Sequence, residues 1–260
     1  MAGKALSKTI WHILPETFRK SIRPARIRLM RHFGLLRGDW KTGASSELSF
    51  WRNALTDGGK TWAPELLAER LDPLTPLQED ICQTLDPSLT KIRILDVGAG
   101  PLTNVGKTWG DRTIEIVAVD PLAEEYDALL AEIAMNPPVR TKKAFAESLT
   151  ESFEKNTFDL AYASNSLDHA LDPLKAIREM LAVTKPGGHV YLWHFRNEGE
   201  HEAYADLHQW NFDAADGDMI IGNGKTSDKL SQLLGDTATV KAGLIVWRGS
   251  EVVVTAIKKA

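Results

Sequence analysis

The sequence predicts an α/β fold in which a seven-stranded, doubly wound, mostly parallel sheet ends in an antiparallel hairpin and follows a helical extension. From Ile92 onward, apolar runs of strand length alternate with helical patterns, which is typical of a parallel sheet with helices on both faces. The last two apolar runs, 237–248 and 251–259, are joined by so short a link that they should pair antiparallel. The first 90 residues show helical patterns without that alternation.

We therefore divide the chain into an N-terminal helical extension or cap, residues 1–90, and a sheet domain, residues 91–260, with a lid-like insertion at 195–225. Helix starts and stops predict helices at 45–55, 63–71, 73–85, 102–110, 122–135, 172–184 and 227–235. Apolar runs between turn residues predict strands at 92–97, 114–120, 139–145, 158–165 and 187–195, besides the final pair.

Charge is distributed unevenly along the chain. Residues 1–38 hold nine Lys or Arg and one Glu, a net charge of +8, so the remainder carries −12 of the total of −4. This segment either packs as a basic helix on the acidic domain or contacts an anionic surface such as membrane headgroups. The excess of positive charge is confined to this region, and we expect no nucleic-acid partner.

Cysteine usage and hydropathy indicate the compartment. The single cysteine, Cys82, excludes an intrachain disulfide and is typical of a reducing environment. No run is long enough to span a membrane, and Lys8 and His12 interrupt the apolar start, so we expect no signal peptide. The expected location is the cytoplasm, with peripheral membrane association through residues 1–38 as an alternative.

The first predicted strand runs into a glycine turn, ILDVGAGPLTNVG. A dinucleotide fingerprint would have a third glycine where Thr103 stands. Asp96, directly before the turn, would repel a pyrophosphate but suits an ammonium group. Asp120 ends the second strand, 22 positions after Gly98, and can accept hydrogen bonds from both hydroxyls of a ribose. The pattern therefore favours S-adenosylmethionine over a nicotinamide dinucleotide.

Four segments, in this order and spacing, resemble the motifs of the Rossmann-like (class I) S-adenosylmethionine-dependent methyltransferases. They are LDVGAGP (95–101), VAVDP (117–121), FDLAYASNSLDH (158–169) and MLAVTKPGGHVYL (180–192). The resemblance covers the chain from Ile92 to its C-terminus and implies a Rossmann-like fold with S-adenosylmethionine as the cofactor.

The same resemblance implies a set of cofactor-binding residues. The methionine end would be held by Asp96, Gly98 and Gly100, with Asn165 beside it, and the ribose by Asp120. Pro121 and Leu122 would flank the adenine. Phe145 stands where an acid usually meets the adenine amino group, which leaves Ala146 and Glu147 as candidates.

Catalytic candidates lie where the fourth and fifth strands end. Methyl transfer to a hydroxyl needs a base, and histidine titrates near neutrality. Asp168 and His169 follow the fourth strand, and His194 and His208 lie in the segment after the fifth. His169 could instead pack under the next helix. The later segment could instead be a solvated loop or a divalent-metal site, but its spacing matches no metal motif, so no metal is expected.

Together these observations predict methyl transfer to a hydroxyl of a small molecule, with a saccharide or glycan terminus as one such acceptor. The acceptor pocket is expected between the N-terminal cap and residues 195–225. Two alternatives stay open: an oxidoreductase that uses a nicotinamide nucleotide, and a regulator that binds S-adenosylmethionine without catalysis. The oligomeric state cannot be predicted from the sequence.

Overall fold

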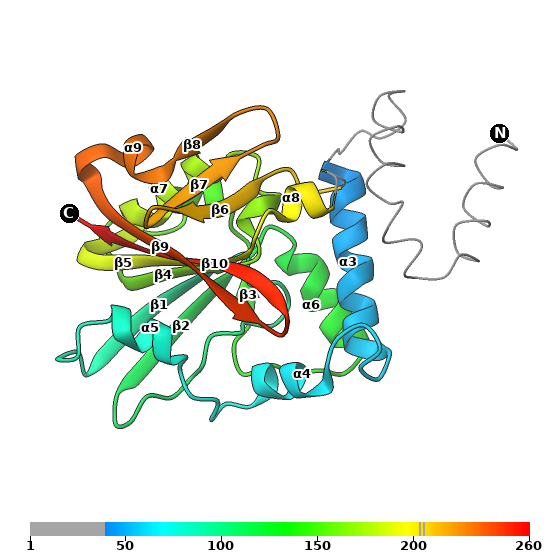
Figure 1. The fold of residues 1–260 in the computed structure, drawn as a ribbon. Coiled ribbons are helices and arrows are strands. Elements are labelled where there is room, and N and C mark those ends of the chain that lie inside the picture. Colours follow the sequence, from blue (N-terminus) through cyan, green and yellow to red (C-terminus); the bar gives the residue numbers. More distant parts are fainter. Residues whose placement is uncertain (1–39, 203, 205) are drawn as a thin grey trace, which may run out of the picture.

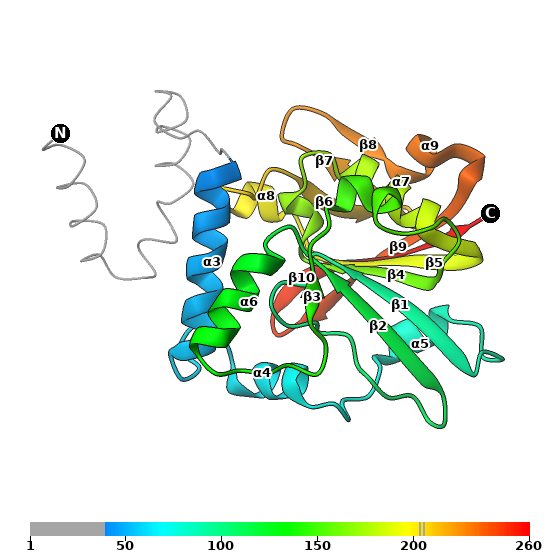
Figure 2. The ribbon, with the colours of Figure 1, turned by 180° about the vertical axis from the view of Figure 1, so that it is seen from behind.

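The computed structural model describes residues 40–202, 204 and 206–260. Seven strands form one sheet in the order β3–β2–β1–β4–β5–β10–β9 (Figures 1 and 2). Their bounds are β1 Lys91–Val97, β2 Thr113–Val119, β3 Thr141–Lys142, β4 Phe158–Ser164, β5 Thr184–Phe195, β9 Ala238–Trp247 and β10 Ser250–Lys259. Strand β10 pairs antiparallel with β5 and β9, and the other pairs are parallel. The predicted fold class is therefore confirmed.

Helices cover both faces of this sheet. The α-helices are α3 Trp40–Thr56, α4 Pro64–Leu71, α5 Glu79–Thr84, α6 Ala123–Glu132, α7 Pro173–Val183, α8 Glu198–His201 and α9 Leu230–Leu234, and the short 3₁₀ helices are η1 Ala146–Glu151, η2 Leu167–His169 and η3 Gly235–Thr237. Helix α7 begins where the sequence predicts, because the Asp172 side chain accepts a hydrogen bond from the Lys175 amide and Pro173 occupies the first turn.

The alternation of side chains along the strands divides the core into two layers. Leu95 and Val97 of β1 face the layer that contains α7. Ile92 and Ile94 of the same strand face the opposite layer, which contains Ile81 of α5. A third cluster joins α3 to α6 beside the sheet, where the two helices lie side by side in both views (Figures 1 and 2).

The helix predicted over residues 102–110 is wrong, because its backbone groups find partners outside the segment. The Leu102 carbonyl accepts a hydrogen bond from Arg70, and the Gly106 amide donates to the Gln78 side chain at 3.1 Å. The Lys107 amide donates to the Thr75 carbonyl at 2.7 Å. The stretch after α4 thus provides hydrogen bonds that a helix would otherwise form internally.

Three other elements are much shorter than predicted. The helix predicted at 73–85 is reduced to α5, Glu79–Thr84. The third strand is limited to Thr141–Lys142, at the edge of the sheet, and the helix predicted at 227–235 is reduced to Leu230–Leu234. Residues 227–229 instead form β8, the third strand of a separate antiparallel sheet with β6 (Asn211–Ala215) and β7 (Asp218–Gly222).

Much of the 195–225 insertion belongs to this second sheet. Phe212 and Met219 are fully buried, and together with Ile221 they belong to the same core layer as α7. The insertion is therefore in large part a packed layer on the main sheet. Its remaining stretch, between α8 and β6, approaches α3, where a Cβ on Gly43 would lie 2.3 Å from the Leu207 side chain.

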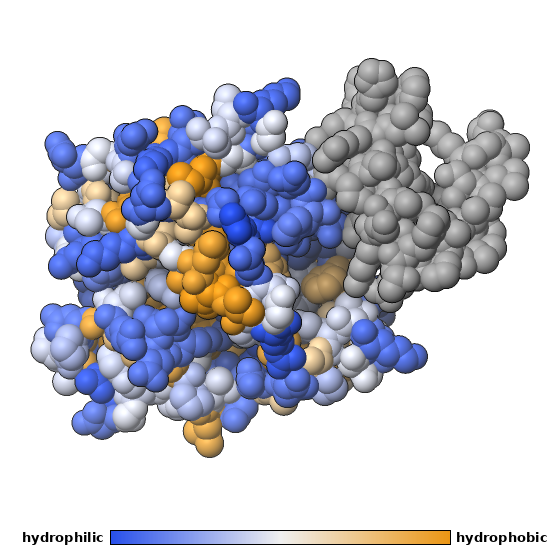
Figure 3. Space-filling view, in the orientation of Figure 1, coloured by the Kyte–Doolittle hydropathy of each residue, from blue (hydrophilic) through white to orange (hydrophobic). Residues whose placement is uncertain are grey.

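Apolar side chains gather on one part of the surface, over the β9–β10 hairpin (Figure 3). Leu244, Ile245 and Val246 of the edge strand β9 are exposed. No helix in the described part of the chain is both long and apolar enough to cross a membrane. The predictions made for residues 1–38, contact with an anionic surface included, lie outside the described residues.

Candidate active site

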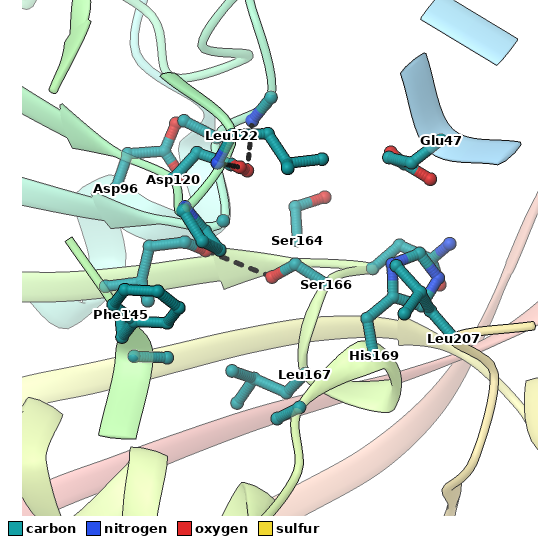
Figure 4. Close-up of a pocket in the computed structure, with 18 of the residues that line it drawn as sticks. Glu47, Asp96, Asp120, Leu122, Phe145, Ser164, Ser166, Leu167, His169 and Leu207 are labelled. Carbon is teal, nitrogen blue, oxygen red and sulfur yellow. Dashed lines mark hydrogen bonds between the residues drawn. The ribbon is translucent and has the colours of Figure 1, made fainter. Parts of the chain in front are cut away.

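A cavity of about 400 Å³ opens at the carboxyl edge of β1, β2 and β4. Parallel strands end together there, which is where open α/β sheets bind ligands. Figure 4 shows side chains from the sheet loops on one side of the cavity and Glu47 of α3 on the other. All nine predicted cofactor residues line it: Asp96, Gly98, Gly100, Asp120, Pro121, Leu122, Ala146, Glu147 and Asn165.

The glycine turn after β1 has room only for glycine at two positions. Gly98 and Gly100 have φ angles of +71° and +63°, which other residues rarely adopt. A Cβ on Gly98 would lie 2.4 Å from that of Ser166, and a Cβ on Gly100 would lie 2.6 Å from the Trp51 ring. The sheet loop and the N-terminal extension therefore both approach this turn closely, and they bring its backbone to the cavity wall.

Asp96 lies at the end of β1 and is almost completely buried. Its carboxylate accepts a 2.5 Å hydrogen bond from the Thr103 hydroxyl. Burial raises the pKa of Asp96 to about 6, while the Thr103 hydrogen bond and the charge of Arg70 act in the opposite direction. The carboxylate is thus held in a fixed position at the cavity, where an ammonium group would stabilise its charged form.

Asp120 lies at the end of β2, and two backbone amides fix its carboxylate. Gly100 N donates to one oxygen at 3.1 Å, and Leu122 N donates to the other at 2.9 Å (Figure 4). Burial raises the pKa of Asp120 to about 7, against the effect of these two bonds. Each oxygen keeps a lone pair for a further donor, as recognition of two ribose hydroxyls requires.

Arg70, at the end of α4, is a cavity residue that the sequence analysis missed. Its guanidinium lies over the Trp62 ring, 4.3 Å from the centroid, and donates to the Leu102 carbonyl. Burial lowers its pKa to about 10, and the Asp96 charge opposes that shift. No sequence signal distinguishes Arg70 from an ordinary basic residue in the last turn of a short helix.

Two more cavity residues come from α3, Glu47 and Trp51. The Trp51 indole donates to the Glu47 carboxylate at 2.8 Å, and its ring packs edge-on against Tyr126 of α6. The N-terminal extension therefore completes the cavity wall. The sequence predicts that the extension borders the pocket, but no local pattern marks Glu47 or Trp51 as part of the site.

The candidates for adenine contact also line the cavity, although the Glu147 carboxylate already accepts a hydrogen bond from another part of the chain. The Glu147 carboxylate accepts a 2.9 Å hydrogen bond from the Leu171 amide, which ties η1 to the loop before α7. Ala146 and Phe145 lie beside it, with Phe145 about half exposed. Asn165 has a left-handed backbone (φ 46°), and its side-chain oxygen accepts from the Phe195 amide at 3.2 Å.

Three of the four catalytic candidates converge at the other end of the cavity. Asp168 Oδ2 lies 2.7 Å from His208 Nδ1 and 3.4 Å from His169 Nε2, and the two ring nitrogens are 3.1 Å apart. We call these residues the Asp168–His169–His208 cluster. His169 is the member that lines the cavity, and Figure 4 shows it beside Leu207.

Charges within this cluster stabilise one another. Burial would raise the pKa of the fully buried Asp168, but His169 and His208 outweigh it and hold that pKa at about 2. Burial likewise would lower the pKa of His208, yet the hydrogen bond to Asp168 raises it. An imidazolium beside this carboxylate is therefore stabilised, as a group that accepts a proton requires.

His194, the fourth candidate, lies apart from the cavity lining. It is fully buried on β5, its ring is 4.5 Å from that of Phe212, and neither ring nitrogen has a hydrogen-bond partner among the described residues. Burial lowers its pKa to about 4. The structure thus brings His169 and His208 together around Asp168 and leaves His194 in the core.

The donor set of the cavity matches a particular kind of ligand. Asp96 and Arg70 offer opposite charges for an amino-acid zwitterion, and Asp120 offers paired acceptors for a ribose. S-adenosylmethionine carries these groups, and the residues present fit it, in a cavity of the size that ligands of its class occupy. Fold and site together are those expected of a Rossmann-like methyltransferase domain.

Comparison with known proteins agrees with this class. Residues 95–192 match the methyltransferase domain family. An uncharacterised methyltransferase of Schizosaccharomyces pombe is 36% identical over 107 residues, which cover 38% of this chain and 38% of that protein. The ubiquinone biosynthesis O-methyltransferase of Bordetella avium is 28% identical over 133 residues, 50% of this chain and 54% of that protein.

Among solved structures, the carbon methyltransferase CurJ has a TM-score of 0.50 at 14% identity, over 95% of this chain and 72% of that one. The likeness is one of fold alone. The chain spans well under half of the length of the yeast relative that it matches. Residues 95–192 are thus similar to a methyltransferase domain, and the cavity residues fit S-adenosylmethionine as its cofactor.

Proposed function

We propose that this protein is an S-adenosylmethionine-dependent methyltransferase that methylates a hydroxyl of a small molecule, such as a saccharide or a glycan terminus. One observation carries the proposal: a single cavity contains both the cofactor-binding residues and His169 of the Asp168–His169–His208 cluster. The two sets of residues lie on neighbouring loops, those that follow β1, β2 and β4. A cofactor and an acceptor bound there would lie next to each other.

When bound, S-adenosylmethionine supplies an activated methyl group. The chain holds that cofactor through Asp96 and Arg70 at its amino-acid end and through Asp120 at its ribose. The walls formed by α3 and the sheet loops exclude water from the cavity. The acceptor is expected to bind in the part of the cavity between α3 and the insertion, which Glu47 and Leu207 line.

His169 is the residue placed to act on the acceptor. As the acceptor oxygen forms its bond to the methyl carbon and the sulfur–carbon bond breaks, the hydroxyl proton passes to the His169 imidazole. Asp168 and His208 orient that imidazole, and the Asp168 carboxylate stabilises the positive charge it gains. An amine acceptor would need no such base. The cluster therefore favours oxygen over nitrogen as the acceptor atom, and the Bordetella avium relative is likewise an O-methyltransferase by name.

Isothermal titration calorimetry tests the cofactor. S-adenosylhomocysteine should bind, and Asp120→Ala should weaken it about tenfold, as loss of a charge-assisted hydrogen bond implies. Asp127→Ala is the matched control, because Asp127 pairs with Arg140 on the exposed side of α6. Binding of a nicotinamide dinucleotide in place of S-adenosylhomocysteine would overturn the proposal.

Catalysis needs its own test. The protein should release S-adenosylhomocysteine in the presence of a hydroxyl acceptor, which can be found by mass spectrometry of a mixed panel of sugars, phenols and quinols. A product heavier by one methyl group, attached to oxygen, is the expected result. Methyl groups found only on nitrogen would contradict the hydroxyl assignment.

A further inference from the structure

Three ligand-type atoms of the Asp168–His169–His208 cluster form a compact triangle. Its edges are the 2.7, 3.1 and 3.4 Å separations given above. A zinc ion lies about 2.0–2.1 Å from nitrogen and oxygen ligands. Tetrahedral ligands at that distance are separated by about 3.3 Å, and smaller angles bring them closer. The three atoms thus have the spacing of ligands that share one small cation, and the described residues contain no other such group of three.

Hydrogen bonds alone cannot pair all three of these atoms well. If both ring nitrogens donate to Asp168, two N–H groups face each other across the 3.1 Å edge; if one accepts, the other must share its proton between two acceptors. A cation at the centre would accept a lone pair from all three atoms at once. The other oxygen of Asp168 is buried and has no hydrogen-bond partner among the described residues. The cost of burying this carboxylate is therefore only partly offset by hydrogen bonds.

The surroundings hold the ligands in place and favour positive charge. The Gln209 amide donates to the Asp168 carbonyl at 2.9 Å, and the Trp210 indole donates to the Ala170 carbonyl at 2.9 Å. These two bonds fix the residues after His208 against η2. Glu198 and Glu202 lie close enough for their charges to act on His208, so the local potential attracts a cation.

We propose that Asp168, His169 and His208 bind one divalent transition-metal ion. The remaining coordination positions would face the cavity, which His169 lines. Two imidazoles and one carboxylate suit zinc, cobalt, manganese or iron, whereas magnesium prefers oxygen ligands. The binding site itself is independent of the proposed function. Its use rests on that function, because an acceptor hydroxyl in the cavity could occupy an open position.

A bound cation would change how the acceptor is activated. It lowers the pKa of a hydroxyl coordinated to it, as it does for bound water, so the proton can leave to solvent and the imidazoles stay with the metal. The oxygen then forms its bond to the methyl carbon as the sulfur–carbon bond breaks. Without the ion, His169 accepts the proton as described above.

The experiment titrates metal-free protein with Zn²⁺, Co²⁺ and Mg²⁺ by calorimetry and records the visible spectrum of the Co²⁺ form. We expect one Zn²⁺ or Co²⁺ per chain, at least a hundredfold tighter than Mg²⁺, with the intense cobalt absorption of a low-coordinate nitrogen and oxygen site. His208→Ala and His169→Ala should each weaken Zn²⁺ at least tenfold. His201→Ala, an exposed histidine of the same insertion, should not.

Folding is checked by S-adenosylhomocysteine affinity, which His208→Ala should leave within threefold because His208 does not line the cavity. The proposal is overturned if stoichiometric Zn²⁺ binding is absent, or if it persists unchanged in both variants that lack a ligand. Metal binding without S-adenosylhomocysteine binding would contradict the proposed function and leave the metal site standing. The reverse result would remove the metal site alone.

Discussion

The hydroxyl of Thr103 donates a 2.5 Å hydrogen bond to the carboxylate of Asp96, and both residues are buried. The same hydroxyl oxygen accepts from the Val105 amide at 3.1 Å. Thr103 stands at the position of the third glycine in a dinucleotide fingerprint. There it orients the Asp96 carboxylate, which we propose to bind the amino-acid end of the cofactor, and it accepts a hydrogen bond within the non-helical loop.

Replacing Thr103 by Val should therefore weaken cofactor binding, because the variant loses the hydrogen bond that orients Asp96 and the one that the Val105 amide donates within the loop. Loss of one hydrogen bond to a buried carboxylate is expected to reduce the affinity for S-adenosylhomocysteine about tenfold at neutral pH. Calorimetry of Thr103→Val measures this directly. Thr239→Val, on the exposed edge strand β9, is the control, and equal affinities for the two variants would contradict the role given to Thr103.

Arg70 should recognise the carboxylate of the cofactor and no other part of it. Arg70→Gln is expected to weaken S-adenosylhomocysteine about tenfold, because a charge-assisted bond is lost. The affinity for methylthioadenosine, which lacks the amino-acid end, should hardly change. Arg52→Gln is the matched control, since Arg52 forms an exposed ion pair with Glu132. An equal loss for both ligands would mean that Arg70 acts on the fold alone.

Cofactor affinity should rise with pH in the acidic to neutral range. The pKa values of Asp96 and Asp120 are raised by burial to about 6 and about 7. Both carboxylates are thus largely protonated at pH 5 in the free protein and ionised at pH 8. The ionised forms accept hydrogen bonds from the ammonium and ribose groups, so binding is favoured as pH increases. Calorimetry from pH 5.5 to 8 tests this, and Asp120→Asn should show a weaker dependence.

Turnover should depend on His169 far more than on histidines outside the Asp168–His169–His208 cluster. His169→Gln is expected to reduce kcat at least a hundredfold, the usual loss for a general base, with S-adenosylhomocysteine affinity nearly unchanged. The exposed His201→Gln variant should keep wild-type turnover. His194→Leu should also keep kcat within about threefold, because His194 does not line the cavity. A large loss of kcat in His194→Leu with normal stability would assign a role to that residue instead.

The contact between residues 72–78 and the loop after β1 should be tight enough to measure. A Cβ on Gly106 would lie 1.9 Å from the Pro76 carbonyl oxygen, so the backbone must move. Gly106→Ala is expected to lower the free energy of unfolding by about 2 kcal/mol, a typical cost of local strain. Gly243→Ala meets nothing within 4 Å and should be neutral. Equal unfolding midpoints in urea would show that the contact is loose.

The sequence predicted much of the fold because its strands carry local signals. Residues 92–97 and 158–165 are apolar runs bounded by turns, and they form β1 and β4 at nearly those limits. The glycines and acids of the turn could be named because strand order places them at one edge of a sheet. The helix at 102–110 failed because its hydrogen-bond partners, Arg70, Thr75 and Gln78, lie about 30 residues away in the chain.

The sequence by itself determined the sheet, the glycine turn and the positions of Asp96 and Asp120 at the ends of two strands, since periodicity and spacing are local properties of a chain. Only the tertiary structure decided which histidines lie together. His169 and His208 are 39 positions apart, and they meet because the insertion folds back so that its backbone pairs with Asp168. It also placed Arg70 in the cavity, because the position of α4 depends on long-range packing and hydrogen bonds that no local pattern records.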